Sequence, residues 1–582
     1  MKRTNRGEKA AAVLTILVLA LWGLAAGSCG PKPGTTEPDK TIPDKVYTGP
    51  KIDDWQFTGP SPMMEEEMAM PSMAGAPMAK EMGFSVGGAK DVNNFRENID
   101  NNYLPAPTDI TYEGLFYDYY FDTGKTEACK KLFCPSYVSA VSRDPVSKAS
   151  DVYLSVGLDS GMKESDFSRK MLNLVIVLDI SGSMGSPFDK YYYDQFGNQH
   201  EVEGADESGA SKLEIAAESI AALMDHLKPG DSLGVVLYDD VSYLAKPLSP
   251  VEKTDMDKIK EHVRALEPGR GTNMESGMNE ATAMFASLSG VDFSVYENRI
   301  IFLTDAMPNM GDTSEGGLRH MTASNAESRL YTTFIGMGVD FNTELIEIIT
   351  KMRGANYYSV HSAKEFKKRM DEEFEYMVTP LVFNLRLQLK AEGYKIEKVY
   401  GSPEASEATG EIMKVNTLFP SKTEGGETRG GLVLLKLKKV SSNTSLTLTV
   451  SYEDRKGVTA SDEKTIKIPD KDKDFYGSTG IRKGILLSRY ADLMKDWIID
   501  ETHAYKENKP VTPSVDPKRG IVVPDAVILG KWEKQSIPLR VSDAYKKLFG
   551  DFKTHFSAEM KALGDTTLEK EVKVLDKLIS FK

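Results

Sequence analysis

The sequence predicts an α/β protein whose central part is a doubly wound, mainly parallel sheet, Rossmann-like in its winding. This part is inserted in or flanked by a β-sandwich-like domain, and a mostly helical region follows it. Three observations predict this arrangement. Short apolar runs alternate with amphipathic helical stretches over residues 170–379. Strands with a period of two stand on both sides of that stretch, and apolar residues at 3–4 spacing dominate the last hundred or so residues.

Length and composition limit the classes of protein that need to be considered. The chain has 582 residues, which is enough for more than one domain. Its net charge of −14 argues against a general nucleic-acid binder. The sequence contains no phosphate-binding loop, nucleophile elbow or histidine cluster. We therefore predict no enzyme activity and identify no small-molecule substrate.

Changes in composition divide the chain into six predicted segments. They are a signal segment (1–29), a flexible Met/Pro/Gly-rich tether (30–83), an N-terminal extension with strands of the β domain (84–169), the central α/β domain (170–379), the β domain (380–470) and the mostly helical region (471–582).

The first segment has the features of an export signal. Basic residues (Lys2, Arg3, Arg6 and Lys9) precede an apolar run over 10–21, and small residues then lead to Cys29. This order resembles a bacterial lipoprotein signal, which implies acylation of Cys29 and a lipid anchor at a membrane of the bacterial cell envelope. An ordinary signal peptide or an uncleaved membrane anchor are the alternatives, and both also imply export.

Methionines crowd the second half of the tether. They are Met63, Met64, Met68, Met70, Met73, Met78 and Met82. Thioethers can bind Cu(I), but no cysteine or histidine joins the group, so we interpret it as part of a flexible linker.

Beyond Cys29, the chain has two cysteines, Cys129 and Cys134. In an oxidising compartment, two cysteines five positions apart can close a small disulfide loop. Two thiols without nearby histidines are too few for a structural zinc site, so we predict the disulfide.

The central domain is predicted from its alternating elements. The apolar run 174–178 is the first strand, and Pro229-Gly230 ends the helix that precedes the second. The later elements are strand 233–238, helices 256–266 and 274–288, strands 299–304, 331–336 and 357–360, and helices 343–352 and 363–377. Outside this domain we predict strands 151–159, 383–389, 432–437 and 446–450, and helices 481–499, 542–560 and 568–579.

Oxygen-bearing side chains follow the first strand of the central domain directly. Asp179, Ser181 and Ser183 have the spacing D-x-S-x-S, and Gly182 permits a tight turn. The carboxyl edge of an open α/β sheet is where ligands bind. Hard oxygen donors on a short loop suit Mg²⁺, Mn²⁺ or Ca²⁺ better than zinc.

This motif is similar to the metal-ion-dependent adhesion site of von Willebrand factor type A domains. Two further positions match that site: Thr272 in the stretch RGTN and Asp305 after an apolar run. The resemblance implies that Asp179, Ser181, Ser183, Thr272 and Asp305 bind one divalent cation, with Mg²⁺ expected and Mn²⁺ or Ca²⁺ as alternatives. The competing interpretation is that these residues only cap helices and form turns.

The region around 91–122 also carries a resemblance. It has a helical stretch, then Leu104-Pro105, and many aromatic residues. It resembles the N-terminal extension of bacterial lipoproteins with a central von Willebrand type A domain, some of which are named after calcium-activated chloride channels. That name implies no pore here.

A long insertion separates the D-x-S-x-S loop from the next helix. It runs over 184–211, far beyond the usual connection of about 2–6 residues. It contains Tyr191, Tyr192, Tyr193 and Phe196, and it must emerge at the metal edge. We leave two interpretations open: a loop that contacts a partner through these aromatic side chains, or decoration without a function.

Three functions fit this pattern. The resemblance implies a binding module in which the ion accepts an acidic group from a partner protein. A second possibility is a structural envelope-assembly protein whose metal only stabilises loops. The third is a metal-dependent hydrolase, which the absence of a recognisable general base beside the motif loops disfavours.

Overall fold

The computed structural model describes most of the chain beyond residue 46. The described residues are 47–59, 81–86, 92–124, 129–163, 167–187, 191–193, 199–201, 210–286, 288, 290–305, 315–337, 352–360, 366, 370–371, 373–402, 410–469, 471, 474–508, 510–511, 513–523 and 536–582.

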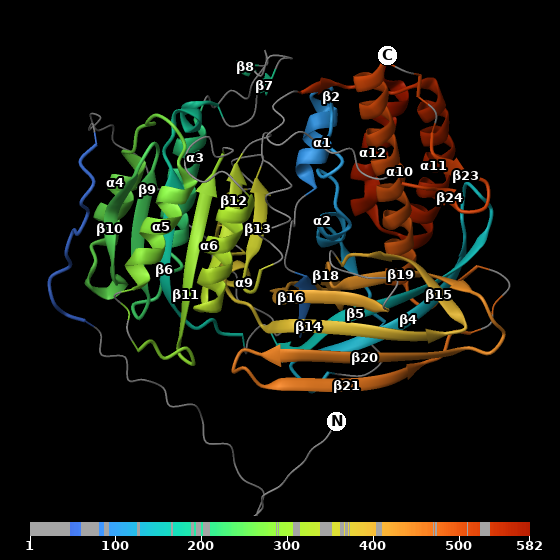
Figure 1. Cartoon of the computed structure of the whole chain (residues 1–582), viewed down its shortest axis with the longest axis horizontal. Coiled ribbons are helices and arrows are strands. Elements are labelled where there is room, and N and C mark those ends of the chain that lie inside the picture. The colour runs from blue at the N-terminus through green and yellow to red at the C-terminus, as the bar shows by residue number, and fades with distance from the viewer. Residues whose placement is uncertain are drawn as a thin grey trace, which may run out of the picture. The chain divides into compact units, whose positions relative to one another are not determined.

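A six-stranded sheet forms the centre of the α/β domain (Figure 1). Its order is β10-β9-β6-β11-β12-β13, and all neighbours are parallel except β10, which pairs antiparallel to β9 at the edge. The strands are β6 (Met171–Asp179), β9 (Ser232–Tyr238), β10 (Ser242–Pro250), β11 (Tyr296–Thr304), β12 (Leu330–Met337) and β13 (Asn356–Val360).

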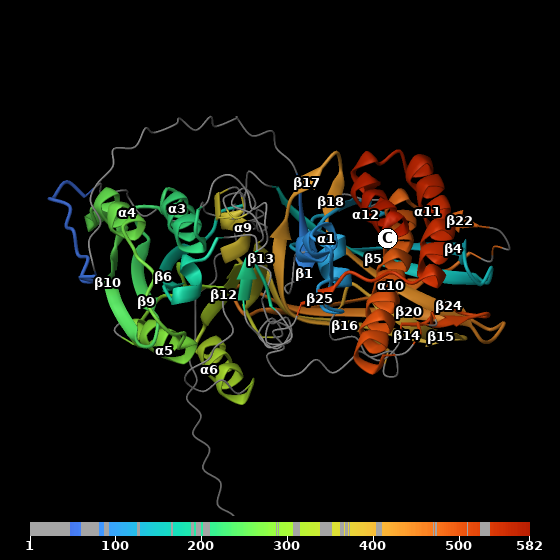
Figure 2. The ribbon, with the colours of Figure 1, turned by 90° about the horizontal axis from the view of Figure 1, so that it is seen from above.

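Helices cover both faces of this sheet, as Figure 2 shows from above. Helices α3 (Lys212–Met224) and α4 (Met256–Arg264) contribute to one apolar core, together with Leu174, Ile176 and Leu178 of β6. Helix α5 (Met274–Phe285) packs with Val175 and Val177 on the opposite face, on which α6 (Glu315–Glu327) also lies. Because successive side chains of a strand point to opposite faces, a continuous apolar run is what a strand covered on both sides requires.

Some predicted elements of this domain differ from the structure. Helix 343–352 lies almost wholly outside the described residues, and of 363–377 the structure describes only a few positions and the short helix α9 (Phe374–Val378). Strand β10 and helix α6 were not predicted. Lys246 and Pro247 interrupt the apolar pattern of β10, and α6 begins with two glycines after Glu315. The predicted fold class is nevertheless confirmed.

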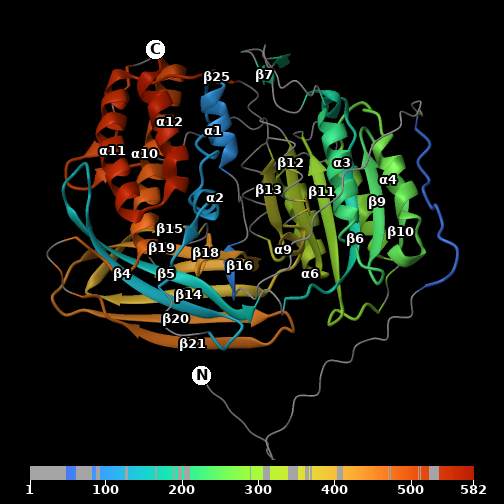
Figure 3. The ribbon, with the colours of Figure 1, turned by 180° about the vertical axis from the view of Figure 1, so that it is seen from behind.

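An antiparallel sheet of ten strands contains chain segments from both sides of the α/β domain (Figure 3). Strand β5, which precedes that domain, lies between β19 and β1, and β1 pairs with β16. One face of the sheet encloses a single apolar core with residues from β1, β5, β14 and β19. The α/β domain is therefore inserted in the β domain, because neither half of this sheet is complete without the other.

The strands of this sheet come from the parts of the chain before and after the α/β domain. They are β1 (Glu81–Val86), β4 (Cys134–Arg143), β5 (Ser150–Lys163), β14 (Val382–Glu392), β15 (Tyr394–Tyr400), β16 (Glu411–Ser421), β19 (Leu432–Lys439), β20 (Ser445–Asp454), β21 (Thr459–Ile466) and β22 (Phe475–Tyr476).

Helices from both ends of the described chain pack together over part of this sheet (Figure 3). The long helix α10 (Thr479–Glu507) is buried along most of its length. Around it lie α1 (Asn93–Asp100), α2 (Tyr112–Tyr117), α11 (Asp543–Leu563) and α12 (Glu569–Ser580). Leu432 and Leu434 of β19 belong to the same apolar core, so the helices and the sheet fold as one layered body.

Short strand pairs complete the described structure. They are β2 (Tyr103–Leu104) with β25 (Ile537–Pro538), β18 (Glu427–Arg429) with β3 (Tyr120–Phe121) and β17 (Thr423–Glu424), β23 (Val515–Asp516) with β24 (Gly520–Ile521), and β7 (Tyr191–Tyr193) with β8 (Gln199–Glu201).

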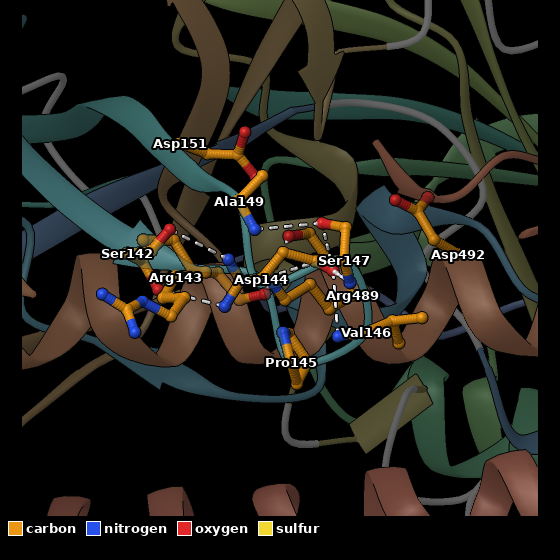
Figure 4. A network of polar contacts seen from close by, with 12 residues as sticks. Ser142, Arg143, Asp144, Pro145, Val146, Ser147, Ala149, Asp151, Arg489 and Asp492 are labelled. Atoms are coloured by element: carbon orange, nitrogen blue, oxygen red, sulfur yellow. Dashed lines mark hydrogen bonds and ion pairs between the residues drawn. The ribbon is translucent and has the colours of Figure 1, made fainter. Parts of the chain in front are cut away.

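A buried polar network fastens α10 to the β4–β5 connection (Figure 4). The Arg489 guanidinium donates to the Ser142 hydroxyl at 3.0 Å and lies 3.7 Å from the Asp144 carboxylate. Asp144 also accepts hydrogen bonds from the backbone N–H groups of Val146 (3.0 Å) and Ser147 (2.7 Å). One carboxylate thus shapes the turn and compensates the buried guanidinium.

Residues 47–59 pack along the edge strand β10. Trp55 stacks on His262, with ring centroids 5.3 Å apart, and Phe57 contacts the ring of Tyr243. Asp54 pairs with the buried Lys246 at 3.2 Å. This stretch and the first three residues of β1 fall within residues 30–83, so over these positions the structure differs from the predicted flexible tether. The apolar side chains and the buried ion pair hold the stretch against the domain.

The remaining predictions of the N-terminal part have different outcomes. Cys29, the signal segment and all but one of the clustered methionines lie outside the described residues, and the exception, Met82, is buried in β1. Cys129 and Cys134 are joined by a disulfide in the structure. Among the helices of the described part, none is sufficiently long and apolar to cross a membrane.

Candidate metal-binding site

The topology brings the predicted ligands from three loops to one edge of the six-stranded sheet. Asp179 is the last residue of β6, and Asp305 follows the last residue of β11. These strands are parallel neighbours, with Leu178 paired to Leu303, so the two carboxylates leave the sheet side by side. Both side chains are buried, with 0% exposure for Asp179 and 2% for Asp305.

A chain of hydrogen bonds joins the two serines to Asp305. The hydroxyls of Ser181 and Ser183 lie 3.1 Å apart. The Ser183 hydroxyl donates to Asp305 Oδ1 at 2.9 Å. Ser181 is buried, whereas Ser183 is partly exposed and the neighbouring Gly182 is exposed. The site therefore opens toward solvent at the D-x-S-x-S turn.

Asp179 accepts hydrogen bonds from the serine turn and from the ends of two neighbouring strands. The Ser181 N–H donates to its Oδ1 at 2.8 Å. The hydroxyls of Tyr238 and Thr304 donate to its Oδ2 at 3.0 and 2.8 Å. Burial, together with the negative charge of Asp305, raises the pKa of the Asp179 carboxyl to about 7. The two carboxylates are thus closely coupled, and a cation between them would favour their ionised forms.

Thr272 belongs to a loop that backbone hydrogen bonds tie to the serine turn. The Gly182 N–H donates to the Arg270 carbonyl at 2.9 Å, and the Gly269 N–H donates to the Ile180 carbonyl. Thr272 itself is buried, with 3% exposure. Asn273 then caps helix α5 by accepting from the Ser276 N–H at 3.1 Å. The same loop therefore starts a helix and lies beside the serine turn.

Lys212 is a further residue of this site that was not predicted. Its ammonium group donates to Asp305 Oδ2 at 2.7 Å, and both side chains are buried. The sequence does contain a signal for it. Lys212 is the first residue of α3, where a cation is disfavoured by the helix dipole unless an anion lies close. Tyr238 and Thr304 were also missed, although each ends a strand at the same edge.

The insertion leaves the domain through a closed neck. Pro187 and Ser211 form an isolated antiparallel bridge, and the Lys212 N–H donates to the Ser186 carbonyl at 3.0 Å. The insertion contains the short strands β7 and β8, which Figure 1 labels. Tyr191, Tyr192 and Tyr193 form β7, whereas Phe196 lies outside the described residues.

The residues at this edge fit a hard divalent cation. Two carboxylates and two serine hydroxyls come together beside the loop that carries Thr272, and all of these side chains offer oxygen ligands. In the described part of the chain no group of three or more His, Cys, Asp or Glu residues is arranged for a metal. The predicted site has only two acidic residues, so its hydroxyls are essential to it. They leave part of the charge of a bound ion uncompensated.

Comparison with known proteins gives a family match for this region. Residues 174–307 match the family described as von Willebrand factor type A domain. The match begins in β6 and ends just after Asp305, so it contains every predicted metal ligand.

Individual relatives are more distant. The human inter-alpha-trypsin inhibitor heavy chain H4 is 22% identical over 219 residues, which are 36% of this chain and only 20% of that protein. A von Willebrand factor type A structure from Catenulispora acidiphila is 15% identical and covers 67% of this chain and 84% of its own, with a TM-score of 0.39. Proximal thread matrix protein 1 from the mussel byssus, described with a zinc-occupied MIDAS motif, is 17% identical and covers 37% of this chain and 50% of its own, with a TM-score of 0.27.

Proposed function

Because the chain contains a von Willebrand factor type A domain, we propose that it binds a partner protein through a divalent ion held at the carboxyl edge of β6 and β11. The observation that supports this most directly is the convergence of Asp179, Ser181, Ser183 and Asp305, linked by short hydrogen bonds at an edge that opens to solvent. Mg²⁺ is the proposed ion, with Mn²⁺ or Ca²⁺ as alternatives.

The charge of the ligand set indicates what the partner contributes. Ser181, Ser183 and Thr272 are neutral, so a bound divalent ion keeps positive charge that attracts an anion. We therefore propose that the partner presents an acidic side chain to the ion. The insertion leaves the domain beside the same edge, and it is the proposed source of additional partner contacts.

Two other roles are compatible with the same residues. In one, the ion only stabilises the loops of a structural envelope protein. In the other, the ion activates water for hydrolysis, which we disfavour because the sequence offers no recognisable general base in the motif loops. We propose a non-enzymatic protein, anchored at the envelope through Cys29.

Thermal unfolding with Mg²⁺ and with EDTA tests the metal site. If Mg²⁺ binds only the folded state, a concentration about 100 times the dissociation constant adds about 2.7 kcal/mol to the free energy of unfolding. Asp179→Ala should abolish this increment. Asp257→Ala, an exposed acid of α4, should keep it. A folded wild-type protein without any metal-dependent shift would refute the proposal.

Capture experiments then separate the three roles. Binding of a purified partner, or of peptides with an acidic side chain, should require Mg²⁺ and fail with EDTA and in Asp179→Ala. A stabilising ion without such binding would support the structural role. Turnover of a substrate by the wild type and not by Asp179→Ala would support hydrolysis.

Metabolic labelling tests the proposed anchor. A palmitate analogue should label the wild-type protein and not Cys29→Ala. Equal labelling of both proteins would exclude acylation at this position.

A further inference from the structure

The carboxylate of Asp305 has two different partners. The Ser183 hydroxyl donates to Oδ1 at 2.9 Å, on the side of the predicted metal ligands. The Lys212 ammonium donates to Oδ2 at 2.7 Å, and the exposed fractions of the two side chains are 0% and 1%. One of the two acidic metal ligands therefore already carries a cation that the chain supplies.

Two independent contacts place Lys212 at this point. Ser211 caps α3 in a capping box with Glu214, which fixes where the helix begins. The backbone N–H of Lys212 donates to the Ser186 carbonyl at the neck of the insertion. The lysine side chain is thus directed into the site by the helix start and by the closed neck. Burying an ammonium group is costly unless an anion compensates it, and Asp305 is that anion.

The charges at the site lead to the inference. With both carboxyls ionised, Asp179 and Asp305 contribute two negative charges and Lys212 one positive charge, so these three side chains together carry one negative charge. We propose that Lys212 is a built-in counter-ion of the metal site. It stabilises the metal-free domain. It also lowers the affinity of the site for a divalent ion, because the ion must bind close to a positive charge. This inference concerns the regulation of the metal site and rests on the proposed function.

The test compares two buried lysines of the same domain in the full chain without its signal segment. Lys212→Met removes the cation at the site and retains an unbranched apolar side chain of similar length. Lys246→Met is the matched control, because Lys246 is equally buried and pairs with Asp54 at 3.2 Å, away from the metal ligands. The two measurements are thermal unfolding in EDTA and calorimetric titration with Mg²⁺ alone.

The two variants should differ in their affinity for Mg²⁺. Both should unfold at lower temperature than the wild type in EDTA. Only Lys212→Met should bind Mg²⁺ more tightly, by about tenfold or more, because a like charge near the divalent ion has been removed. Unchanged or weaker Mg²⁺ affinity in a folded Lys212→Met protein would overturn the inference.

A second variant keeps the test decisive if Lys212→Met is unstable. In the double variant Lys212→Met/Asp305→Asn, the carboxylate that needs the lysine is absent. Its unfolding temperature in EDTA should therefore exceed that of Lys212→Met. If Lys212→Met is unfolded in EDTA, addition of Mg²⁺ should restore its fold. An equal or lower temperature for the double variant, or no recovery with Mg²⁺, would contradict the counter-ion role.

The outcomes also distinguish this inference from the proposed function. A wild-type protein that binds Mg²⁺, together with a Lys212→Met protein that binds it no more tightly, refutes the counter-ion alone. A wild type without binding and a Lys212→Met protein with binding would show that the lysine blocks the site. Absence of binding in both would refute both proposals.

Discussion

Two regions of the protein bury pairs of carboxylates and compensate their charge differently. At the junction of α1 and α12, Glu571 pairs with Arg96 and accepts a hydrogen bond from the Tyr119 hydroxyl at 2.6 Å. Asp118 nearby pairs with Arg96 at 2.9 Å and with Lys570. Two acids therefore meet two cations.

The edge of the six-stranded sheet has a different balance. Lys212 pairs with Asp305, which also accepts from the Ser183 hydroxyl, whereas Asp179 accepts from hydroxyl and backbone N–H groups. A buried carboxylate with an incomplete complement of cations is costly unless a ligand provides the missing charge. We propose that the helical junction uses its charges for folding, whereas the sheet edge keeps negative charge for the ion of the proposed function.

Removing a cation from the helical junction should have the largest effect. Arg96→Met leaves Glu571, which is 0% exposed, without its guanidinium partner. We expect the free energy of unfolding to fall by about 3–5 kcal/mol. Urea unfolding should give the same loss with Mg²⁺ and with EDTA. Lys547→Met, which breaks an exposed pair with Asp551, should change stability by less than about 1 kcal/mol. If the loss of stability in Arg96→Met depended on Mg²⁺, the two regions would not differ in how they use their charges.

The helical region should also make stability depend on pH. Tyr545 lies 2.8 Å from Asp496 Oδ2 and 2.7 Å from Asp500 Oδ2, but its hydroxyl has one hydrogen to donate. Burial raises the pKa of Asp496 to about 8, with smaller contributions from the charges of Asp500 and Asp492. The folded protein then holds a proton that the unfolded chain has released, so stability should fall as pH rises toward about 8.

Chemical unfolding between pH 6 and pH 8 measures this dependence. The slope expected from one such group is about 1.4 kcal/mol per pH unit, or roughly 2–3 kcal/mol over this range. Asp496→Asn mimics the protonated carboxyl and should remove most of the slope. The same slope in Asp496→Asn would assign the pH dependence to other groups.

Two serines offer a smaller and more direct comparison. Ser142 accepts from Arg489 at 3.0 Å, and its loss should cost about 1.5–3 kcal/mol without changing Mg²⁺ affinity. Ser183→Ala should cost about 1 kcal/mol or less in EDTA, since the partly exposed hydroxyl is replaced by solvent, but it should weaken Mg²⁺ binding. Calorimetric titration and urea unfolding of both variants check this. Equal Mg²⁺ affinities would exclude Ser183 as a ligand.

Shortening the insertion should have a small effect on stability, and a favourable one. The bridge between Pro187 and Ser211 allows a short glycine-containing turn to replace the residues between them. A shorter loop has a lower closure entropy, so stability should rise by about 1–2 kcal/mol. Thermal unfolding and Mg²⁺ titration should show a domain with metal affinity close to that of the wild type. Loss of partner capture would support the partner-contacting interpretation, and unchanged capture would support decoration.

Part of the candidate site was predictable from the D-x-S-x-S pattern after a strand, and the family resemblance added Thr272 and Asp305. Strands of a parallel sheet end at one edge, so polar residues directly after β6 and β11 had to lie together. Lys212 was not predicted, because 28 residues separate it from Ser183 and only the closed neck returns the chain to the site. Its position at the first turn of α3 was the available signal.

The same limit applies to the fold. Apolar periodicity indicated strands on both sides of the α/β domain, and they do share one sheet. The periodicity did not show that β1, from the Met-rich segment, lies between β5 and β16, or that residues 47–59 pack on β10. A short strand in a segment of low periodicity carries little local information, and its position depends on which partner leaves an edge open.

By itself, the sequence determined the fold class of this protein and its central sheet, because both depend on the period of apolar residues, which is a local property. The proposed set of oxygen ligands came from the resemblance of its motifs to a known family. Only the tertiary structure decided that Lys212 compensates Asp305, that Arg96 joins α1 to α12, and that α10 is fastened through Arg489 (Figure 4). The physical reason is that a buried charge pairs with whichever opposite charge the packing brings into contact with it. The separation of two residues along the sequence does not determine that pairing.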